Sequence, residues 1–166
     1  MKQKLKRFFF TTLPKYLVGI AIPLTVGILS AILTRDSMSI YGEITKPPLA
    51  PPAILFPIVW SILYLLMGIS STLVFINREK DIENAERGLK FYIISLILNF
   101  IWSPIFFIRE SYLLSLIILA FLFVSIVYTI LAYRKVSPLA AYLQIPYALW
   151  VLFAGYLNFA ILILNR

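Results

Sequence analysis

Residues 112–133 read YLLSLIILAFLFVSIVYTILAY, a segment without a single charged side chain. A helix needs about 20 apolar residues to cross the hydrocarbon core of a bilayer, so this segment predicts a transmembrane helix. Four further segments have the same length and character: residues 16–33, 54–76, 91–108 and 138–164. We therefore predict an all-α integral membrane protein, a bundle of five transmembrane helices that forms a single domain over residues 1–166.

The composition of the whole chain also indicates a protein that is surrounded by lipid. Hydrophobic residues make up 61% of its 166 residues, the mean hydropathy is +0.94, and only 13% of the residues are charged. A soluble domain has about 25% charged residues and could not cover so much apolar surface. The net charge of +8 comes from basic residues in the connecting segments. Membrane proteins carry them there, so we expect no nucleic-acid partner.

The lack of cysteine and histidine limits the chemistry that this chain can perform. It excludes disulfides, the usual zinc and iron–sulfur sites, and a histidine-ligated haem. Ser-His-Asp and Cys-His catalysis both need a histidine base. No acidic or basic side chain lies inside the five predicted spans. We therefore expect no metal site, no required cofactor and no conventional catalytic residue.

The distribution of Lys and Arg predicts the orientation of the chain in the membrane. Eleven of them lie in residues 1–15, 77–90 and 134–135, which fall on one side of the predicted bundle, and four lie on the opposite side. Since cytoplasmic segments carry an excess of basic residues, we predict a cell-membrane protein with a cytoplasmic N-terminus and an outside C-terminus. The first span is longer than the apolar part of a signal peptide and lacks a clear cleavage site, so we expect it to be retained.

A proline-rich segment, KPPLAPP at residues 46–52, connects the first two spans. Proline lacks a backbone N–H and restricts the residue before it, so this segment cannot be helical. Two interpretations are open on physical grounds. The segment is either a rigid linker or a stiff, extended lid on the outer mouth of the bundle, formed by Pro47, Pro48, Pro51 and Pro52.

Aromatic and polar residues recur at helical spacing on one face of three predicted spans. They are Trp60 and Tyr64 in the second span, Asn99, Trp102 and Phe106 in the third, and Tyr147, Trp150, Ala154 and Asn158 in the fifth. An asparagine in hydrocarbon needs a partner, so Asn99 and Asn158 either bond a neighbouring helix or line a cavity. The fourth span carries only scattered Ser and Thr, and we expect it to be the most lipid-exposed.

Tryptophan in membrane proteins most often anchors a helix at the membrane interface. Trp60, Trp102 and Trp150 lie inside their spans instead, where the indole N–H groups need partners. This position favours a shared aromatic box that stacks against a flat ligand. Small-molecule sites are commonly of this kind, mostly apolar with a few polar anchors.

Four segments together resemble the successive signatures of one membrane-protein family. They are KPPLAPP (46–52), FPIVWSILYLLMG (56–68), LNFIWSPIFF (98–107) and PYALWVLFAGYLN (146–158). In order and spacing they are similar to the TspO/MBR family of translocator and tryptophan-rich sensory proteins, over residues 40–165. The chain departs from the family pattern at Ile40, where tryptophan is usual, and at Leu49 and Ile54, where aromatic residues are common.

The resemblance implies a ligand cavity near one membrane face, closed by the proline-rich first loop. Family members bind tetrapyrroles such as protoporphyrin IX, sterols and benzodiazepine-type compounds, and they are commonly dimers. We expect Trp60 and Trp150 to lie against the two faces of the ligand and Asn99 to bond its polar edge. The resemblance also implies that six further residues contribute to the ligand pocket: Tyr64, Trp102, Phe106, Tyr147, Ala154 and Asn158.

Three functions are open at this point. We predict a membrane receptor or sensor for flat hydrophobic small molecules, with porphyrin as the expected ligand and membrane lipid around the protein. A porphyrin or lipid transporter is an alternative, although such proteins usually carry intramembrane charges and internal repeats, which this sequence lacks. Light-dependent porphyrin degradation, attributed to some family members, is the third. We also expect a homodimer, for which Gly27 and Ala31 form a small-xxx-small pair on the first span.

The charge distribution leads to a test of the orientation. A reporter enzyme that is active only outside the cytoplasm should be active when it is fused after Arg166. We expect this because eleven of the fifteen basic residues lie in segments on the N-terminal side of the bundle. The same reporter fused within residues 77–90 serves as the control and should show the opposite behaviour. Cytoplasmic activity of the fusion after Arg166 would mean that the bundle is inverted.

Overall fold

The computed structural model describes residues 11–37 and 39–165, and within these residues it contains helices and no strand. Five of the helices are long and apolar enough to cross a membrane. They are α2 (Leu13–Thr34), α4 (Leu55–Ile76), α5 (Ile82–Phe107), α6 (Tyr112–Val136) and α7 (Pro138–Leu164). The predicted fold class, an all-α bundle of five membrane-spanning helices, is confirmed.

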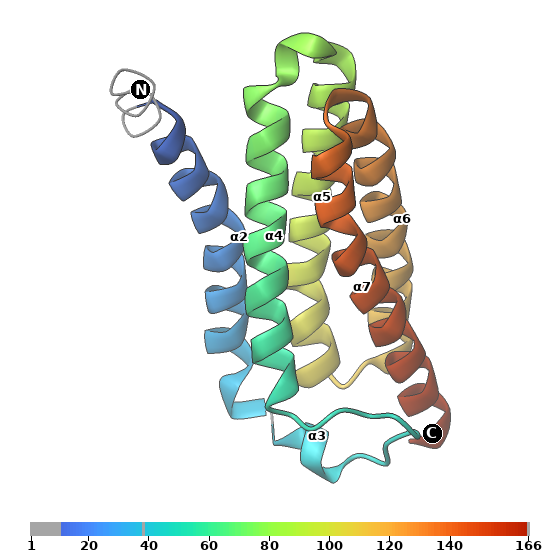
Figure 1. Ribbon diagram of the computed structural model, residues 1–166. Helices are drawn as coiled ribbons and strands as arrows, with labels where there is room; N and C mark the ends of the chain where they lie inside the picture. The colour runs from blue at the N-terminus through green and yellow to red at the C-terminus, as the bar shows by residue number, and fades with distance from the viewer. Residues whose placement is uncertain (1–10, 38, 166) are drawn as a thin grey trace.

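The short elements between the spans lie at the two ends of the bundle (Figure 1). One end carries the 3-10 turn η3 (Arg78–Lys80) between α4 and α5 and the direct turn from α6 to α7. The other end carries η2 (Arg35–Ser37), the short helix α3 (Ile40–Glu43) and the proline-rich segment. The basic residues Lys2, Lys4, Lys6, Arg7 and Arg166, which contribute to the predicted orientation, lie outside the described residues.

The third long helix begins at Ile82 and not at residue 91, where the apolar span begins. Asp81 caps it, because its carboxylate accepts a hydrogen bond from the Asn84 backbone N–H at 3.1 Å and from the Asn84 amide at 2.8 Å. These two bonds hold the pKa of Asp81 below its usual value. The ion pair between Arg87 and Glu83 then stabilises the next turn. The polar first turns of α5 therefore continue the helix beyond its apolar part.

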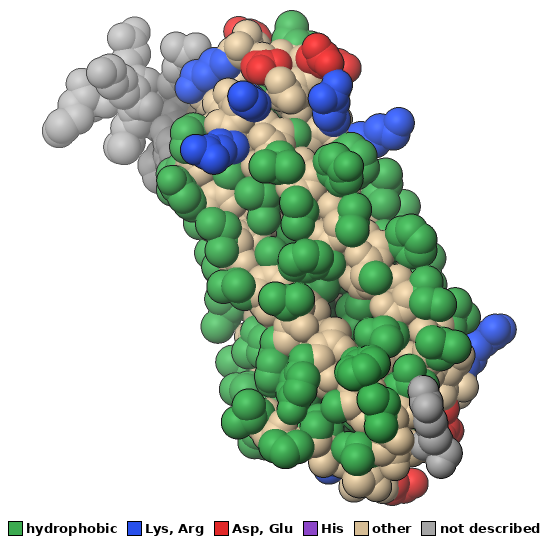
Figure 2. Space-filling model, turned by 90° about the vertical axis from the view of Figure 1, so that its right-hand side faces the viewer, with side chains coloured by type: hydrophobic (Ala, Val, Ile, Leu, Met, Phe, Trp, Pro, Cys, Tyr) green, Lys and Arg blue, Asp and Glu red, His purple; other side chains and the backbone are tan. Residues whose placement is uncertain are grey.

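The five long helices pack in a ring in which each touches its two neighbours, in the order α2, α4, α7, α6, α5 and back to α2. In Figure 1, α2 leans away from α4 toward its N-terminal end, while the other four run close together. Figure 2 shows a face whose middle is covered by hydrophobic side chains, with the charged ones gathered toward the two ends. This distribution suits a bundle that crosses a hydrocarbon layer.

The expectation that the fourth span is the most lipid-exposed is wrong. A third of the apolar window of α6 is buried, against 17% for α2, which is the least buried of the five. Ser115, Ser125 and Thr129 of α6 lie inside the bundle. The Thr129 hydroxyl donates to the Ser125 carbonyl at 2.9 Å. Because all three are buried, these Ser and Thr residues mark the packed face of α6 and not an exposed one.

Helices α2 and α4 approach most closely at two glycines. A Cβ atom on Gly68 would lie 2.5 Å from the Ile20 Cα atom and 2.8 Å from the Gly19 carbonyl oxygen. A Cβ atom on Gly19 would overlap the Thr72 hydroxyl. Because the atoms facing Gly68 belong to the backbone, they cannot rotate away. Small residues at a crossing let helix backbones come together in lipid, where there is no hydrophobic force between them.

The glycine crossing leads to a stability prediction. Gly68→Ala should lower the unfolding midpoint in detergent and cost about 1–3 kcal/mol, because the added methyl group forces α2 and α4 apart. Gly155→Ala is the matched control, since nothing lies within 4 Å of a Cβ atom there. It should be neutral or slightly stabilising, because alanine is the better helix former. Equal thermal unfolding curves for the two variants would contradict the close approach.

Candidate functional site

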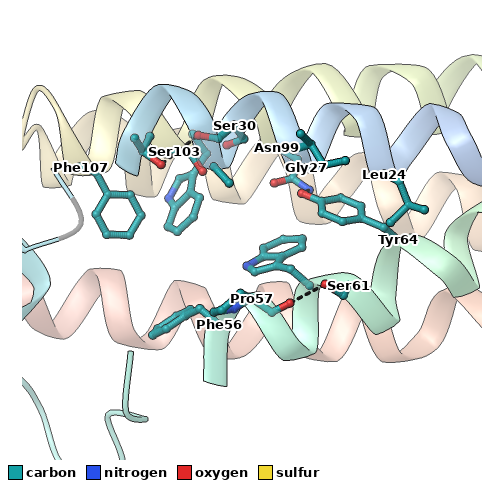
Figure 3. A pocket seen from close by; sticks show the side chains of 15 residues that line it. Leu24, Gly27, Ser30, Phe56, Pro57, Ser61, Tyr64, Asn99, Ser103 and Phe107 are labelled. Carbon is teal, nitrogen blue, oxygen red and sulfur yellow. Dashed lines mark hydrogen bonds between the residues drawn. The ribbon is translucent and has the colours of Figure 1, made fainter. Parts of the chain in front are cut away.

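A cavity of about 250 Å³ lies between α2, α4 and α5, toward the end of the bundle that carries the proline-rich segment (Figure 3). It is partly open, and its walls are mostly apolar. The residues that line it are Leu24, Gly27, Ile28, Ser30, Ala31 and Thr34 of α2, Phe56, Pro57, Trp60, Ser61 and Tyr64 of α4, and Asn99, Trp102, Ser103 and Phe107 of α5.

Two tryptophans from different helices face this cavity. The Trp60 ring on α4 stacks on Tyr64, with ring centroids 5.4 Å apart and an interplanar angle of 27°. Tyr147 of α7 supports Trp60 from behind, edge-on at 6.1 Å. On α5, Trp102 packs against Phe106 at 5.4 Å. Contacts of this geometry stabilise aromatic clusters, so both indoles are held in fixed orientations before a ligand arrives.

Two hydroxyl groups in the cavity wall already have acceptors on their own helices. The Thr34 hydroxyl donates to the Ser30 carbonyl at 2.9 Å, and the Ser61 hydroxyl donates to the Pro57 carbonyl at 2.7 Å, as the dashed line in Figure 3 shows. These bonds satisfy the hydroxyl protons without any ligand.

Asn99 brings an amide to the wall of the cavity. Its side chain is buried, with the residue 3% exposed, and lies beside Tyr64 in Figure 3. The amide donates to the Tyr64 hydroxyl at 3.4 Å, a long and therefore weak hydrogen bond. An asparagine amide has two donor protons and a carbonyl oxygen. Asn99 thus keeps hydrogen-bonding capacity for a polar atom inside the cavity.

Asn158 has a different role. Of the two interpretations that the sequence left open, bonding to a neighbouring helix or lining a cavity, the first describes Asn158. Its carbonyl oxygen accepts from the Trp102 indole N–H at 3.3 Å and from the Ser115 hydroxyl at 2.9 Å. Its amide donates to the Tyr112 carbonyl at 2.9 Å. Asn158 therefore joins α7 to α5 and α6 and holds Trp102 in place, whereas Asn99 faces the cavity.

The remaining predicted site residues lie around the cavity and not in its wall. Phe106, Ala154 and Asn158 line a small adjoining hollow of about 20 Å³, which has room for about one water molecule. Tyr147 is fully buried behind Trp60. The structure thus brings Trp60, Tyr64, Asn99 and Trp102 together in one wall and places these others behind it.

Trp150 does not face Trp60 across the cavity. It contacts the edge of Phe56 at 6.0 Å and packs against Phe153 at 5.6 Å. It lines a separate, open groove between α4 and α7 together with Val59. The expectation that Trp60 and Trp150 enclose a ligand between them does not match this geometry, in which Trp102 and not Trp150 shares the cavity with Trp60.

The proline-rich segment is fastened across the end of the bundle. The Tyr41 hydroxyl donates to the Pro51 carbonyl at 3.1 Å, and the Tyr156 hydroxyl of α7 donates to the Pro48 carbonyl at 3.0 Å. Burial raises the pKa of Tyr41, which keeps this donor protonated. Asn165 forms two hydrogen bonds with the Thr45 backbone, at 2.9 and 3.0 Å. These bonds hold the segment across the end of the bundle, while none of Pro47, Pro48, Pro51 and Pro52 lines the cavity.

The sequence reasoning missed the contribution of α2 to the cavity. Four of the α2 residues in its wall, Gly27, Ser30, Ala31 and Thr34, follow the i, i+3, i+4, i+7 spacing of one helical face. This run of small residues was the signal that could have revealed them. A Cβ atom on Gly27 would overlap the Tyr64 ring of the same chain. The Gly27–Ala31 pair thus lies in the cavity wall of its own chain, which disfavours its predicted role in a dimer contact.

Comparison with known proteins supplies the relatives of this chain. A sequence profile described as the TspO/MBR family matches residues 19–164. The chain is 40% identical to the tryptophan-rich protein TspO of Chlorobaculum tepidum over 147 residues, which cover 88% of this chain and 92% of that protein. It is 36% identical to the translocator protein of Homo sapiens, covering 80% and 78% of the two chains. It is 29% identical to the tryptophan-rich sensory protein of Cereibacter sphaeroides, covering 90% and 89%.

The two asparagines provide a matched stability test. Asn158→Leu should lower the unfolding midpoint markedly and cost about 1–3 kcal/mol, because it leaves the Trp102 N–H and the Ser115 hydroxyl without their shared acceptor. Asn99→Leu should cost less, since Asn99 makes one long hydrogen bond to Tyr64. Thermal unfolding of both variants in the same detergent measures the difference. A larger loss for Asn99→Leu would reverse the two assigned roles.

Proposed function

Because this chain belongs to the TspO/MBR family, we propose that it is a multi-pass membrane receptor or sensor that binds flat hydrophobic small molecules. The observation that carries the proposal is the cavity in which Trp60 and Trp102 are fixed beside the incompletely bonded amide of Asn99. The relative named as a tryptophan-rich sensory protein supports the sensor role. We propose a tetrapyrrole such as protoporphyrin IX as the ligand, and no resident cofactor.

The proposed binding mode uses stacking and burial. Trp60 is already stacked on Tyr64, so a planar ring system can extend the stack at little cost in side-chain order. Asn99 bonds a polar atom at the edge of the ring. The described residues of the cavity wall include no charged side chain. Acidic substituents of the ligand would therefore point toward the lid, where the Lys46 amine lies over the Tyr41 ring at 5.0 Å.

The size of the cavity suggests how binding could be signalled. Its volume of about 250 Å³ lies just below the range of about 300–1,000 Å³ for drug-sized ligands, so a macrocycle must widen it. Helix α2 forms one wall and is the least buried of the five spans, so it is the wall that yields most easily. A ligand that binds better to the widened state would shift the population toward it. We propose that this displacement of α2 is the sensory response.

Transport is the second candidate, and the name translocator protein of several relatives favours it. The absence of charged residues from the apolar spans weighs against a coupled transporter, because ion-driven carriers use such groups. Photochemical degradation of a bound porphyrin would rely on the ligand and the neighbouring indoles, since the spans carry no acid or base that titrates near neutrality. Flux measurements in proteoliposomes and product spectra after illumination separate these functions from binding alone.

The proposed setting is a cell membrane, with the N-terminus in the cytoplasm and membrane lipid around the bundle. The described basic residues Lys15, Arg78, Lys80 and Arg134 lie in segments at the same end of the bundle, which supports this orientation. We also propose a homodimer. Its interface would lie on a face other than that of Gly27 and Ala31, which line the cavity.

A binding titration with tryptophan variants tests the proposed site. Trp60→Ala and Trp102→Ala should each weaken protoporphyrin binding by about 1–3 kcal/mol, as loss of a stacking partner does. Asn99→Leu should weaken it by about 1 kcal/mol, the net worth of one hydrogen bond. The measurement follows the absorbance of the porphyrin, because the variants alter the intrinsic tryptophan fluorescence.

Trp150→Ala is the matched control for this titration and should bind like the unaltered protein, because Trp150 lies outside the cavity. Haem should bind no more tightly than metal-free protoporphyrin, since the chain has no histidine or cysteine to hold the iron. If Trp150→Ala loses binding and Trp60→Ala does not, the site lies on the α4–α7 side. If haem binds much more tightly, the stacking mode is wrong.

A further inference from the structure

A second hollow lies at the opposite end of α2, nearer its N-terminus. It is a groove of about 440 Å³ between α2, α4 and α5, in the region where Figure 1 shows α2 leaning away from α4. Val18 and Ile22 of α2, Phe75 of α4 and Ile93 of α5 make its walls largely apolar. It shares none of its described lining residues with the aromatic cavity. Gly19, one of the two glycines at the crossing of α2 and α4, lines this groove.

One charged side chain, Lys15, stands at this groove. It is exposed, belongs to the first turns of α2, and forms no ion pair within the described residues. A positive charge near a helix N-terminus is not compensated by the helix dipole. The ten residues before Thr11 add four more basic residues and no acidic one. The Lys15 amine is therefore available to an anion from outside this stretch of the chain.

A buried tyrosine hydroxyl also lies in the wall of the groove. Tyr92 lines it and is 4% exposed, and its buried hydroxyl makes no hydrogen bond to the described residues. Native proteins rarely leave a buried hydroxyl without a partner. The neighbouring Ser71 and Thr72 hydroxyls already donate to the Gly68 carbonyl, at 3.2 and 2.7 Å. Of these three hydroxyls, that of Tyr92 is the one that donates no hydrogen bond to the described residues.

We propose that this groove is a binding site for one anionic phospholipid of the bilayer. The groove has a charged, a hydrogen-bonding and an apolar part, which correspond to the headgroup, the ester linkage and the acyl chain of the lipid. The anionic headgroup pairs with the Lys15 amine, an ester carbonyl accepts from the Tyr92 hydroxyl, and an acyl chain lies along Val18, Ile22 and Ile93. Basic residues placed directly before a transmembrane helix select anionic lipids in the same way.

Native mass spectrometry of the full chain, released from detergent with phosphatidylglycerol and phosphatidylcholine, tests the assignment. One phosphatidylglycerol should bind in preference to phosphatidylcholine, and Lys15→Gln should reduce that preference about fivefold. Lys90→Gln is the matched control, because Lys90 is exposed at the same end but does not line the groove. Equal binding of the two lipids, or equal losses in the two lysine variants, would show only diffuse attraction and overturn the proposal.

Two further comparisons locate the lipid within the groove. Ile22→Trp, which fills the groove, should abolish the preferred adduct. Leu17→Trp should leave it intact, because Leu17 is exposed on the same helix but does not line the groove. Unfolding midpoints of both variants check that they are folded. Tyr92→Phe should weaken ester-linked phosphatidylglycerol and leave an ether-linked analogue, which lacks the carbonyl, unchanged. Loss of the adduct in Leu17→Trp, or its full displacement by an equal concentration of oleate, would contradict a phospholipid held in this groove.

Discussion

Lipid offers no hydrogen bonds, and this constraint determines where every polar group of the chain lies. Backbone groups are satisfied within the helices, and hydroxyls such as those of Ser61 and Thr129 donate to carbonyls of their own helix. Asn158 is satisfied by three partners on neighbouring helices. Against this background, the weakly bonded amide of Asn99 keeps capacity for a further hydrogen bond, and the buried hydroxyls of Tyr92, Tyr133 and Tyr147 make none to the described residues.

The five long helices are joined by different kinds of contact. Helices α5, α6 and α7 are tied together through Asn158, while α2 is joined to α4 at the close approach of Gly19 and Gly68. Gly19 lines the groove that contains aliphatic side chains and Lys15, and the cavity lined by indoles lies nearer the C-terminal end of α2. Helix α2 therefore contributes to two hollows of different character.

The sequence predicted well what depends on length and composition, namely the five spans and the non-helical proline segment. It predicted poorly what depends on how each helix is rotated about its axis. In lipid both faces of a helix are apolar, so periodicity does not tell inside from outside as it does in water. This explains why α6 seemed exposed and why Trp150 seemed to face Trp60. The wall formed by α2 was missed because its small residues carry no chemical signature until a ring packs beside them.

A cavity without charged side chains in its described wall selects its ligand by shape. The aromatic residues fix two surfaces, Trp60 and Trp102, whose positions are set by Tyr64 and Asn158. The distance from these indoles to the opposite wall depends on the small side chains of α2, from Gly27 to Thr34. A larger side chain at Gly27 would overlap Tyr64, so the width of the cavity depends on the absence of large side chains at these α2 positions. Substitutions in α2 could therefore change the width of the cavity while Trp60, Trp102 and Asn99 stay the same.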